Sequence, residues 1–193
     1  MKILLCLALG AAGACVAGAS SFAAGSGLEV HGLYAFNFND DESDGSNMDN
    51  TFGGGASFVF SLSPNIKLDL GADYYKPEDK DSSDAKVQII PICAALRIGG
   101  NLGPVFLYAG GGAGYSFNSA DIKGVSSSDA DFENSMIYFA CGGAEFELSD
   151  SVYIRGEFRY NWLKPEFKVK SMDYSEDIKF DHMQVRAGLG FNF

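Results

Sequence analysis

The sequence is poor in the residue types that most catalytic and nucleic-acid-binding sites use. Its 193 residues include only two histidines and four cysteines, and 14 lysines and arginines stand against 25 aspartates and glutamates. The resulting net charge of −11 excludes the basic face that a nucleic-acid binder needs. Charged residues make up 20% and aromatic residues 13%, which is too apolar and too aromatic for a disordered chain. The length fits one domain rather than two.

The two histidines and the cysteines form no recognisable chemical motif. His31 and His182 lie far apart, and neither a His-x-Ser nor a Gly-x-Ser-x-Gly pattern is present. Cys93 and Cys141 lack the spacing of a zinc site, although a disulfide between them stays open. The sequence therefore predicts no enzyme, no catalytic or metal-binding residue and no cofactor.

Residues 1–23 are expected to be an export signal. Lys2 gives a positive start, Ile3–Ala19 carries no charge, and small residues precede two candidate cleavage points. We place cleavage after Ala23, with Ala19 as the alternative; lipidation at Cys15 and an uncleaved membrane anchor are further alternatives. Residues 24–193 then form the mature domain, about 170 residues long.

The 24 glycines argue against a helical bundle, because each glycine costs a helix interior about 1 kcal/mol. From Leu28 onward, apolar and polar residues alternate with the period of a β-strand, most clearly over 182–193. The alternation predicts eight strands, most of them as long as tilted strands that cross a bilayer. The predicted strands are 28–38, 51–62, 66–76, 86–98, 105–117, 135–148, 152–162 and 182–193.

The links between these strands alternate between short and long. The short ones carry turn residues and cover 63–65, 99–104 and 149–151; the long ones are polar and cover 39–50, 77–85, 118–134 and 163–181. An all-β fold of this kind, a closed eight-stranded antiparallel up-and-down transmembrane β-barrel, sorts its loops by length, whereas a sandwich has no reason to do so. The first long loop contains Asp40-Asp-Glu-Ser-Asp-Gly45, which matches a calcium loop only in part. We expect a solvated acidic loop there, with weak divalent-cation binding as the alternative.

Charge separates the two faces of the predicted strands. The apolar faces carry only Lys76 and Lys86, so we assign them to lipid and assign the charged faces to the lumen. Glu145 and Arg155 are predicted to form an ion pair across one hairpin, while Arg159 and Arg186 need acid partners, for which Glu157 and Asp73 are candidates. The predicted lumen charge network is Asp73, Glu145, Arg155, Glu157, Arg159 and Arg186.

Aromatic residues are predicted to form two outward girdles around a band of aliphatic and small residues, as membrane barrels require. The girdle near the long loops contains Phe36, Phe38, Phe52, Tyr74, Tyr115, Phe117, Tyr138, Tyr160 and Trp162. The girdle near the short turns contains Phe58, Phe60, Phe146, Phe191 and Phe193.

The last strand ends on Phe193, with Leu189 and Phe191 at alternate positions before it. With the Pro104–Tyr115 stretch and Ile90-Pro91-Ile92, this strand makes the chain resemble the small bacterial outer-membrane β-barrel proteins of the OmpA/OmpX type. The resemblance implies a bacterial outer-membrane location and contact with outer-membrane lipid. It also implies that Leu189, Phe191 and Phe193 are the signal read by the outer-membrane assembly machinery.

The mature chain has a net charge of −12, and the four long loops contribute −5, −3, −3 and −1 of it. We therefore expect a structural or surface-interaction protein that displays four acidic extracellular loops, with a partner binding through 118–134 and 163–181. One alternative is a narrow, porin-like pore for small solutes. Another is a soluble lipocalin-like binder whose apolar faces point inward.

Overall fold

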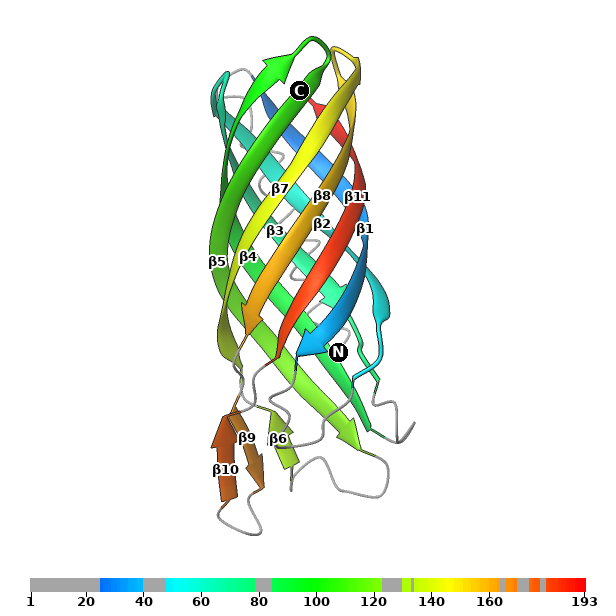
Figure 1. Cartoon of the computed structure of the whole chain (residues 1–193), viewed down its shortest axis with the longest axis vertical. Coiled ribbons are helices and arrows are strands. Elements are labelled where there is room, and N and C mark those ends of the chain that lie inside the picture. Colours follow the sequence, from blue (N-terminus) through cyan, green and yellow to red (C-terminus); the bar gives the residue numbers. More distant parts are fainter. Residues whose placement is uncertain are drawn as a thin grey trace.

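The computed structural model describes residues 25–39, 48–78, 85–122, 130–132, 134–163, 166–169, 174–177 and 180–193. Eight antiparallel strands close into a barrel in the order β1-β11-β8-β7-β5-β4-β3-β2 (Figure 1), which confirms the predicted fold class. No helix in the described part of the chain is long and apolar enough to cross a membrane. The barrel strands are β1 (Ser26–Asn39), β2 (Thr51–Ser63), β3 (Ile66–Tyr75), β4 (Ala85–Leu102), β5 (Val105–Ile122), β7 (Ser135–Ser149), β8 (Val152–Leu163) and β11 (Asp181–Asn192).

The short turns lie together at one end of the barrel, which is the upper end in Figure 1 and also carries the C-terminus. The end of β11 meets the start of β1 there, since the Phe193 amide donates to the Ser26 carbonyl at 2.9 Å. The predicted six-residue turn at 99–104 is wrong, because the β4–β5 ladder continues to the pair Leu102 and Val105. Only Gly103 and Pro104 form the turn, and Gly103 supplies its positive φ of 63°.

The other end carries the long connections and a small second sheet. Three short strands, β6 (Ala130–Phe132), β9 (Glu166–Val169) and β10 (Tyr174–Asp177), pair antiparallel in the order β10-β9-β6. Figure 1 shows this sheet beyond the barrel, below its lower rim. The sequence predicted only loops here, because three or four residues are too few to show a strand period.

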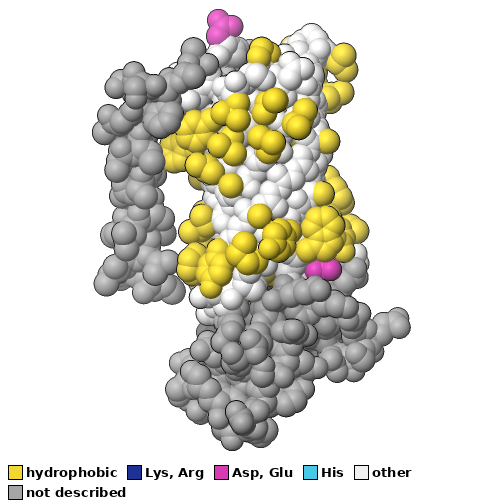
Figure 2. Space-filling view, turned by 90° about the vertical axis from the view of Figure 1, so that its left-hand side faces the viewer, with side chains coloured by type: hydrophobic (Ala, Val, Ile, Leu, Met, Phe, Trp, Pro, Cys, Tyr) yellow, Lys and Arg dark blue, Asp and Glu magenta, His cyan; other side chains and the backbone are white. Residues whose placement is uncertain are grey.

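The wall of the barrel separates apolar from charged side chains. Figure 2 shows apolar side chains gathered in two bands around the face in view, with a paler band between them. Small residues also stand directly opposite one another across four neighbouring strands: Gly32 on β1, Ala187 on β11, Gly156 on β8 and Ala144 on β7. The outward aromatic side chains with high exposure are Phe52, Tyr74, Tyr115, Phe117, Tyr138 and Trp162 toward the long loops, Phe146, Phe191 and Phe193 toward the short turns, and Phe158 midway along β8.

The soluble lipocalin-like alternative is therefore wrong, because that alternative requires the apolar face to point inward. Phe38 is a second correction. It was predicted to face outward, but Asn37 adopts a φ of 53° and the β1–β11 register shifts between Phe36 and Asn39. This bulge reverses the alternation, so Phe38 packs against the buried residues inside the barrel.

Candidate functional site

The inward faces of the barrel carry a balanced set of buried charges. Five acids and five bases form ion pairs there, and eight strands leave only enough interior space for such side chains to fill it. The acids are Glu29, Asp69, Asp73, Glu145 and Glu157; the bases are Lys67, Arg97, Arg155, Arg159 and Arg186.

The first ion cluster lies toward the short turns. Its core is Asp69, which accepts Arg97 Nη2 at 2.7 Å and Arg155 Nη1 at 2.8 Å. Arg97 also pairs with Glu145, and the second guanidinium nitrogen of Arg155 lies 2.6 Å from Glu29. Lys67 completes the cluster by donating to Glu145. The first ion cluster is thus Lys67, Glu145, Arg97, Asp69, Arg155 and Glu29.

The predicted ion pair between Glu145 and Arg155 is wrong, although the two residues do lie on one hairpin as predicted. The two residues face each other across β7 and β8, as do Glu147 and Tyr153, Gly143 and Glu157, and Cys141 and Arg159. Instead of bonding to each other, Glu145 pairs with bases of β3 and β4 and Arg155 pairs with acids of β1 and β3. In a narrow lumen, long side chains reach across the barrel as easily as along its wall.

The second ion cluster, Asp73, Arg186, Glu157 and Arg159, lies next to the first. Arg186 pairs with Asp73 and lies 3.5 Å from Glu157, which also accepts Arg159 Nη2 at 2.9 Å. Both arginines therefore have the acid partners that the sequence predicted. Tyr108 donates its hydroxyl to Glu157 at 2.9 Å, and the guanidinium of Arg159 lies 3.8 Å from the centre of the Phe139 ring.

His31 connects the two ion clusters. Its Nε2 lies 2.8 Å from Asp73 Oδ1, and its Nδ1 lies 3.4 Å from Glu29 Oε1. The pairs therefore form one continuous series in which acids alternate with bases. In order, the series is Lys67, Glu145, Arg97, Asp69, Arg155, Glu29, His31, Asp73, Arg186, Glu157 and Arg159.

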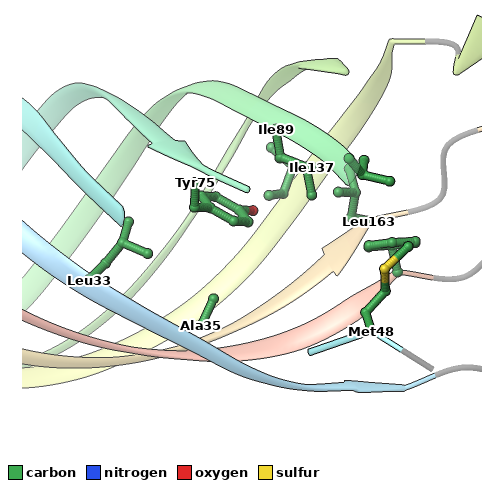
Figure 3. Close-up of a cluster of buried hydrophobic side chains, with 9 residues drawn as sticks. Leu33, Ala35, Met48, Tyr75, Ile89, Ile137 and Leu163 are labelled. Atoms are coloured by element: carbon green, nitrogen blue, oxygen red, sulfur yellow. The ribbon is translucent and has the colours of Figure 1, made fainter. Parts of the chain in front are cut away.

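An apolar cap fills the barrel at the long-loop end (Figure 3). Two of its members, Met48 and Phe180, come from the connections just before β2 and β11, and the others come from five strands. His182 holds Phe180 in place, because its Nδ1 lies 2.9 Å from the Phe180 carbonyl while Phe38 stacks on its ring at 4.9 Å. The apolar cap is Leu33, Ala35, Met48, Tyr75, Val87, Ile89, Ile137, Leu163 and Phe180.

The apolar cap was not predicted from the sequence, although its strand residues occupy the inward-facing positions of the alternating pattern. On β4 the inward face runs from Arg97 through Ala95 and Cys93 to Ile89 and Val87, and it thus changes from charged to apolar along one strand. Only the position of these residues at the long-loop end distinguishes them from lipid-facing side chains.

At the short-turn end the interior opens into a vestibule of about 740 Å³. Lys67 and Phe106 lie at its inner limit, with the ammonium 4.6 Å from the ring centre, and Glu147, Asn101 and the terminal Phe193 line it further out. By contrast, the space between Asp73, Cys93 and Arg159 measures about 10 Å³, which is room for about one water molecule. The interior is therefore open at one end, filled with charge at its centre and closed by apolar side chains at the other end.

The remaining predicted residues lie outside this interior network or outside the described part of the chain. Leu189 and Phe191 are exposed and point away from the lumen, whereas the exposed Phe193 lies at the end of the barrel and lines the vestibule. Cys93 and Cys141 are free thiols, so the structure contains no disulfide between them. The predicted signal 1–23 and the acidic stretch 40–45 fall among the residues that the structure does not describe.

Comparison with known proteins gives the same fold. Neisserial surface protein A superposes with a TM-score of 0.64 at 17% identity, over 87% of this chain and 97% of that protein. OprG of Pseudomonas aeruginosa gives 0.62 at 14% identity over 89% and 97%. Ail, the attachment invasion locus protein of Yersinia pestis, gives 0.56 at 15% identity over 89% and 100%.

A search of curated protein sequences finds no match to this chain. The family model of the outer membrane protein beta-barrel domain, however, matches residues 3–193. The outward apolar bands, the charged lumen and the closed antiparallel topology are the features that such a domain needs in lipid. The chain therefore belongs to the outer membrane protein beta-barrel domain family and resides in the bacterial outer membrane.

Proposed function

We propose that this protein is a non-enzymatic structural and surface-interaction barrel whose lumen passes no sizeable solute. The observation that carries the proposal is the interior itself. Glu29 and Arg97 have 0% exposed surface, the central void holds about one water molecule, and the apolar cap closes the long-loop end. Every charged group that fills the centre has an opposite partner, so the filling is electrostatically satisfied and costly to open.

Recognition belongs to the long loops under this proposal. The loops 118–134 and 163–181, which were expected to contact a partner, are joined by the β10-β9-β6 sheet. Shared main-chain hydrogen bonds fix the two segments relative to each other, so they present one surface rather than two independent loops. The four long loops carry all of the mature net charge of −12, which favours a partner with a basic surface.

The same acidity disfavours sulfated polyanions as ligands. Ail of Yersinia pestis was solved in complex with the heparin analogue sucrose octasulfate, and that complex shares a TM-score of 0.52 and 16% identity with this chain. We do not extend that ligand to this protein, because four acidic loops repel a polyanion. A basic protein or peptide surface is the partner class that the loops fit.

A surface-charge comparison tests the recognition half of the proposal. One variant replaces Asp131, Glu166, Glu176 and Asp177, the acids of the small sheet, with the matching amides. The control variant makes the same change in net charge at Asp40, Asp41, Glu42 and Asp44. Binding of cells that display each protein is measured on poly-lysine-coated and heparin-coated surfaces.

We expect the displayed wild type to bind poly-lysine and not heparin, and the small-sheet variant to lose more of this binding than the control variant. Equal losses in the two variants would show that net charge alone determines binding and that the joined loops play no special part. Binding to heparin in preference to poly-lysine would contradict the assignment of the partner class.

A narrow pore remains the second candidate, and the vestibule is the observation that favours it. A space of about 740 Å³ already leads inward as far as Lys67, so only the ion clusters and the apolar cap separate the two sides. Planar-bilayer recording distinguishes the candidates. We expect no steady single-channel steps, whereas steps that change when Arg159 or Arg186 is substituted would establish the pore.

A further inference from the structure

A groove of about 690 Å³ lies on the outer wall of the barrel, where β7, β8, β11 and β1 face lipid. Small residues of three neighbouring strands, Ala187, Gly156 and Ala144, form its floor. The apolar side chains that line it toward the short turns are between 37% and 50% exposed, so they stand up from the wall. These side chains are Val30, Leu189, Ile154 and Phe146. We call this space the outer groove.

The floor of the outer groove continues across β1 and β2. Ala187 stands opposite Gly32, and Gly32 stands opposite Gly54. A Cβ at Gly32 would meet nothing within 4 Å, and one at Gly54 would meet only a backbone oxygen, at 3.1 Å. Open space therefore lies over both positions. Tyr34 and Phe52, whose ring centres are 4.8 Å apart, stand beside these glycines on the long-loop side.

The outer groove runs obliquely down the wall, from Tyr74 on β3, which stands opposite Gly54, to Ala144 on β7. Tyr74 is the last residue but one of β3 at the long-loop end, whereas Ala144 lies five residues from the short-turn end of β7. Five steps between strands that are about 4.8 Å apart and tilted by about 40° lower the groove by about 15 Å. This depth is half of a hydrocarbon core about 30 Å thick, so the outer groove crosses one leaflet.

A cation lies at the long-loop end of the outer groove. Lys76 follows β3 directly, its side chain is exposed, and its ammonium lies 5.9 Å from the centre of the Tyr74 ring. Thr51 donates its hydroxyl to the Lys76 carbonyl at 2.7 Å, which holds this residue against the start of β2. Among the described residues no ion pair joins Lys76 to a carboxylate. Its charge is therefore available to a ligand.

The position of Lys76 fits the headgroups of the outer leaflet. Long loops of outer-membrane barrels face outward from the cell, and aromatic residues such as Tyr74 mark the level of the lipid headgroups. An ammonium at that level attracts an anionic headgroup. A cation at one end of an apolar groove that is one leaflet deep matches the two parts of an anionic lipid.

We propose that the outer groove and Lys76 bind one phosphate-bearing lipid of the outer leaflet. The phosphate pairs with the Lys76 ammonium beside Tyr74, and one acyl chain lies along the floor from Gly54 to Ala144. Because surrounding lipid is as apolar as the groove, close packing holds the chain and the charge selects the headgroup. This site is on the wall of the barrel, so it does not depend on the partner proposed for the loops.

Native mass spectrometry of the whole barrel, released from a neutral detergent, counts the lipids that remain bound. The barrel is offered dimyristoyl phosphatidic acid and, separately, dimyristoylglycerol, which lacks only the phosphate. We expect one molecule of phosphatidic acid for each barrel, bound about fivefold more tightly than the diacylglycerol, as an exposed ion pair allows. Equal binding of the two lipids would overturn the proposal.

Removal of the cation tests the headgroup site. Lys76→Gln should weaken the binding of phosphatidic acid about fivefold and leave that of the diacylglycerol unchanged. The control is Lys86→Gln, because Lys86 is the other lysine on an outward face of the sequence pattern and stands opposite Asp121 in the β4–β5 register. Equal losses in the two variants would show unspecific attraction and contradict the assignment of the phosphate to Lys76.

Filling of the floor tests the acyl-chain site. Gly156→Leu places a side chain where a Cβ meets nothing within 4 Å, and it should weaken the binding of both lipids at least about threefold through lost packing. Ala94→Leu is the control, since Ala94 is an exposed residue of β4 on the other side of the barrel. If Gly156→Leu fails to fold, Ala187→Leu fills the neighbouring position of the floor. Binding that survives in the filled variant would overturn the proposal.

Two further results would assign the site to another occupant and contradict the proposal. Inorganic phosphate that binds as tightly as phosphatidic acid would show that the outer groove contributes nothing. Barrel dimers that appear in the same spectra and are lost in Gly156→Leu would show that a second copy of the chain, rather than a lipid, fills the outer groove.

Discussion

Glu145 and Arg155 lie directly opposite each other on β7 and β8, yet they form no ion pair. Each is paired with residues of other strands: Glu145 with Lys67 and Arg97, and Arg155 with Asp69 and Glu29. Glu145 and Arg155 are thus paired across the lumen rather than along their own hairpin, and this arrangement has measurable consequences.

A double-mutant cycle should detect the cross-lumen pairing. Glu145→Gln combined with Arg97→Met should show a coupling energy of about 1–3 kcal/mol, because the two side chains are in direct contact. The same cycle with Glu145→Gln and Arg155→Met should show a smaller coupling, although these two residues are closer in register. Urea unfolding of the barrel in lipid vesicles supplies the free energies, and a larger coupling for Arg155 would contradict the pairing described above.

Removal of a single charge from the first ion cluster should be strongly destabilising. Arg97→Ala removes one of the two bases that Asp69 and Glu145 each contact, which leaves three acids and two bases in the first ion cluster, and an uncompensated buried charge costs about 3–5 kcal/mol. Glu147, which is exposed in the vestibule, is a suitable control, since Glu147→Gln should change the free energy of unfolding by less than about 0.5 kcal/mol. Similar effects of the two substitutions would mean that the interior is hydrated rather than filled.

Two pairs of glycines should respond differently to alanine. At Gly55 and Gly188 an added Cβ meets backbone and side-chain atoms at 3.0 Å or less, and overpacking of this kind costs about 1–3 kcal/mol. At Gly32 and Gly156 an added Cβ meets nothing within 4 Å, because these positions face lipid. Gly55→Ala and Gly188→Ala should therefore lower the unfolding midpoint, whereas Gly32→Ala and Gly156→Ala should leave it unchanged or raise it.

The apolar cap should contribute to stability as a conventional hydrophobic core does. Leu163→Ala removes a side chain that is 1% exposed within the cap, and such a truncation costs about 2–5 kcal/mol. Leu107→Ala removes a lipid-facing side chain on β5 and should cost less, because it leaves no internal cavity. A cap truncation as mild as the Leu107 control would indicate that the long-loop end is not packed in the membrane.

The reactivity of the two native cysteines of the barrel tests whether the interior is closed, and this test needs no substitution. Cys93 and Cys141 are free and inward-facing, and they lie among Phe139, Arg159 and neighbouring side chains. A water-soluble maleimide added to the folded barrel should react with them at least about 100-fold more slowly than with the urea-unfolded chain, since thiol reactivity requires access. Rapid labelling of the folded barrel would reveal an aqueous path that favours the pore candidate.

The sequence determined the strands and their faces because alternation is a local property of β-structure. The last three predicted strands begin or end within one residue of β7, β8 and β11, and the pairing of Glu147 with Tyr153 follows from the short turn between them. The alternation of side chains along each strand also assigned Arg159 and Arg186 to the lumen, together with their acid partners Glu157 and Asp73. These inferences need only chain-adjacent residues.

The features that the sequence missed depend on non-local geometry. The partners of Glu145 lie on β3 and β4, which no pattern within β7 specifies. Phe38 faces inward because Asn37, the residue before it, has a left-handed backbone conformation. The alternation of apolar and polar residues in the sequence does not reveal this change of side. The apolar cap combines strand residues with Met48 and Phe180 from two connections, and its members resemble lipid-facing residues in type.

Some acids and bases of the alternating series can pair with one another only when the barrel closes. Glu29 on the first barrel strand pairs with Arg155 on β8, and Asp73 on β3 pairs with Arg186 on the last barrel strand. An incompletely closed sheet in the bilayer would hold these acids and bases apart, exposed to hydrocarbon without partners. The closing step, in which β11 meets β1, therefore neutralises the interior at the same time as it removes the last free strand edges, so partly assembled barrels are disfavoured on both counts.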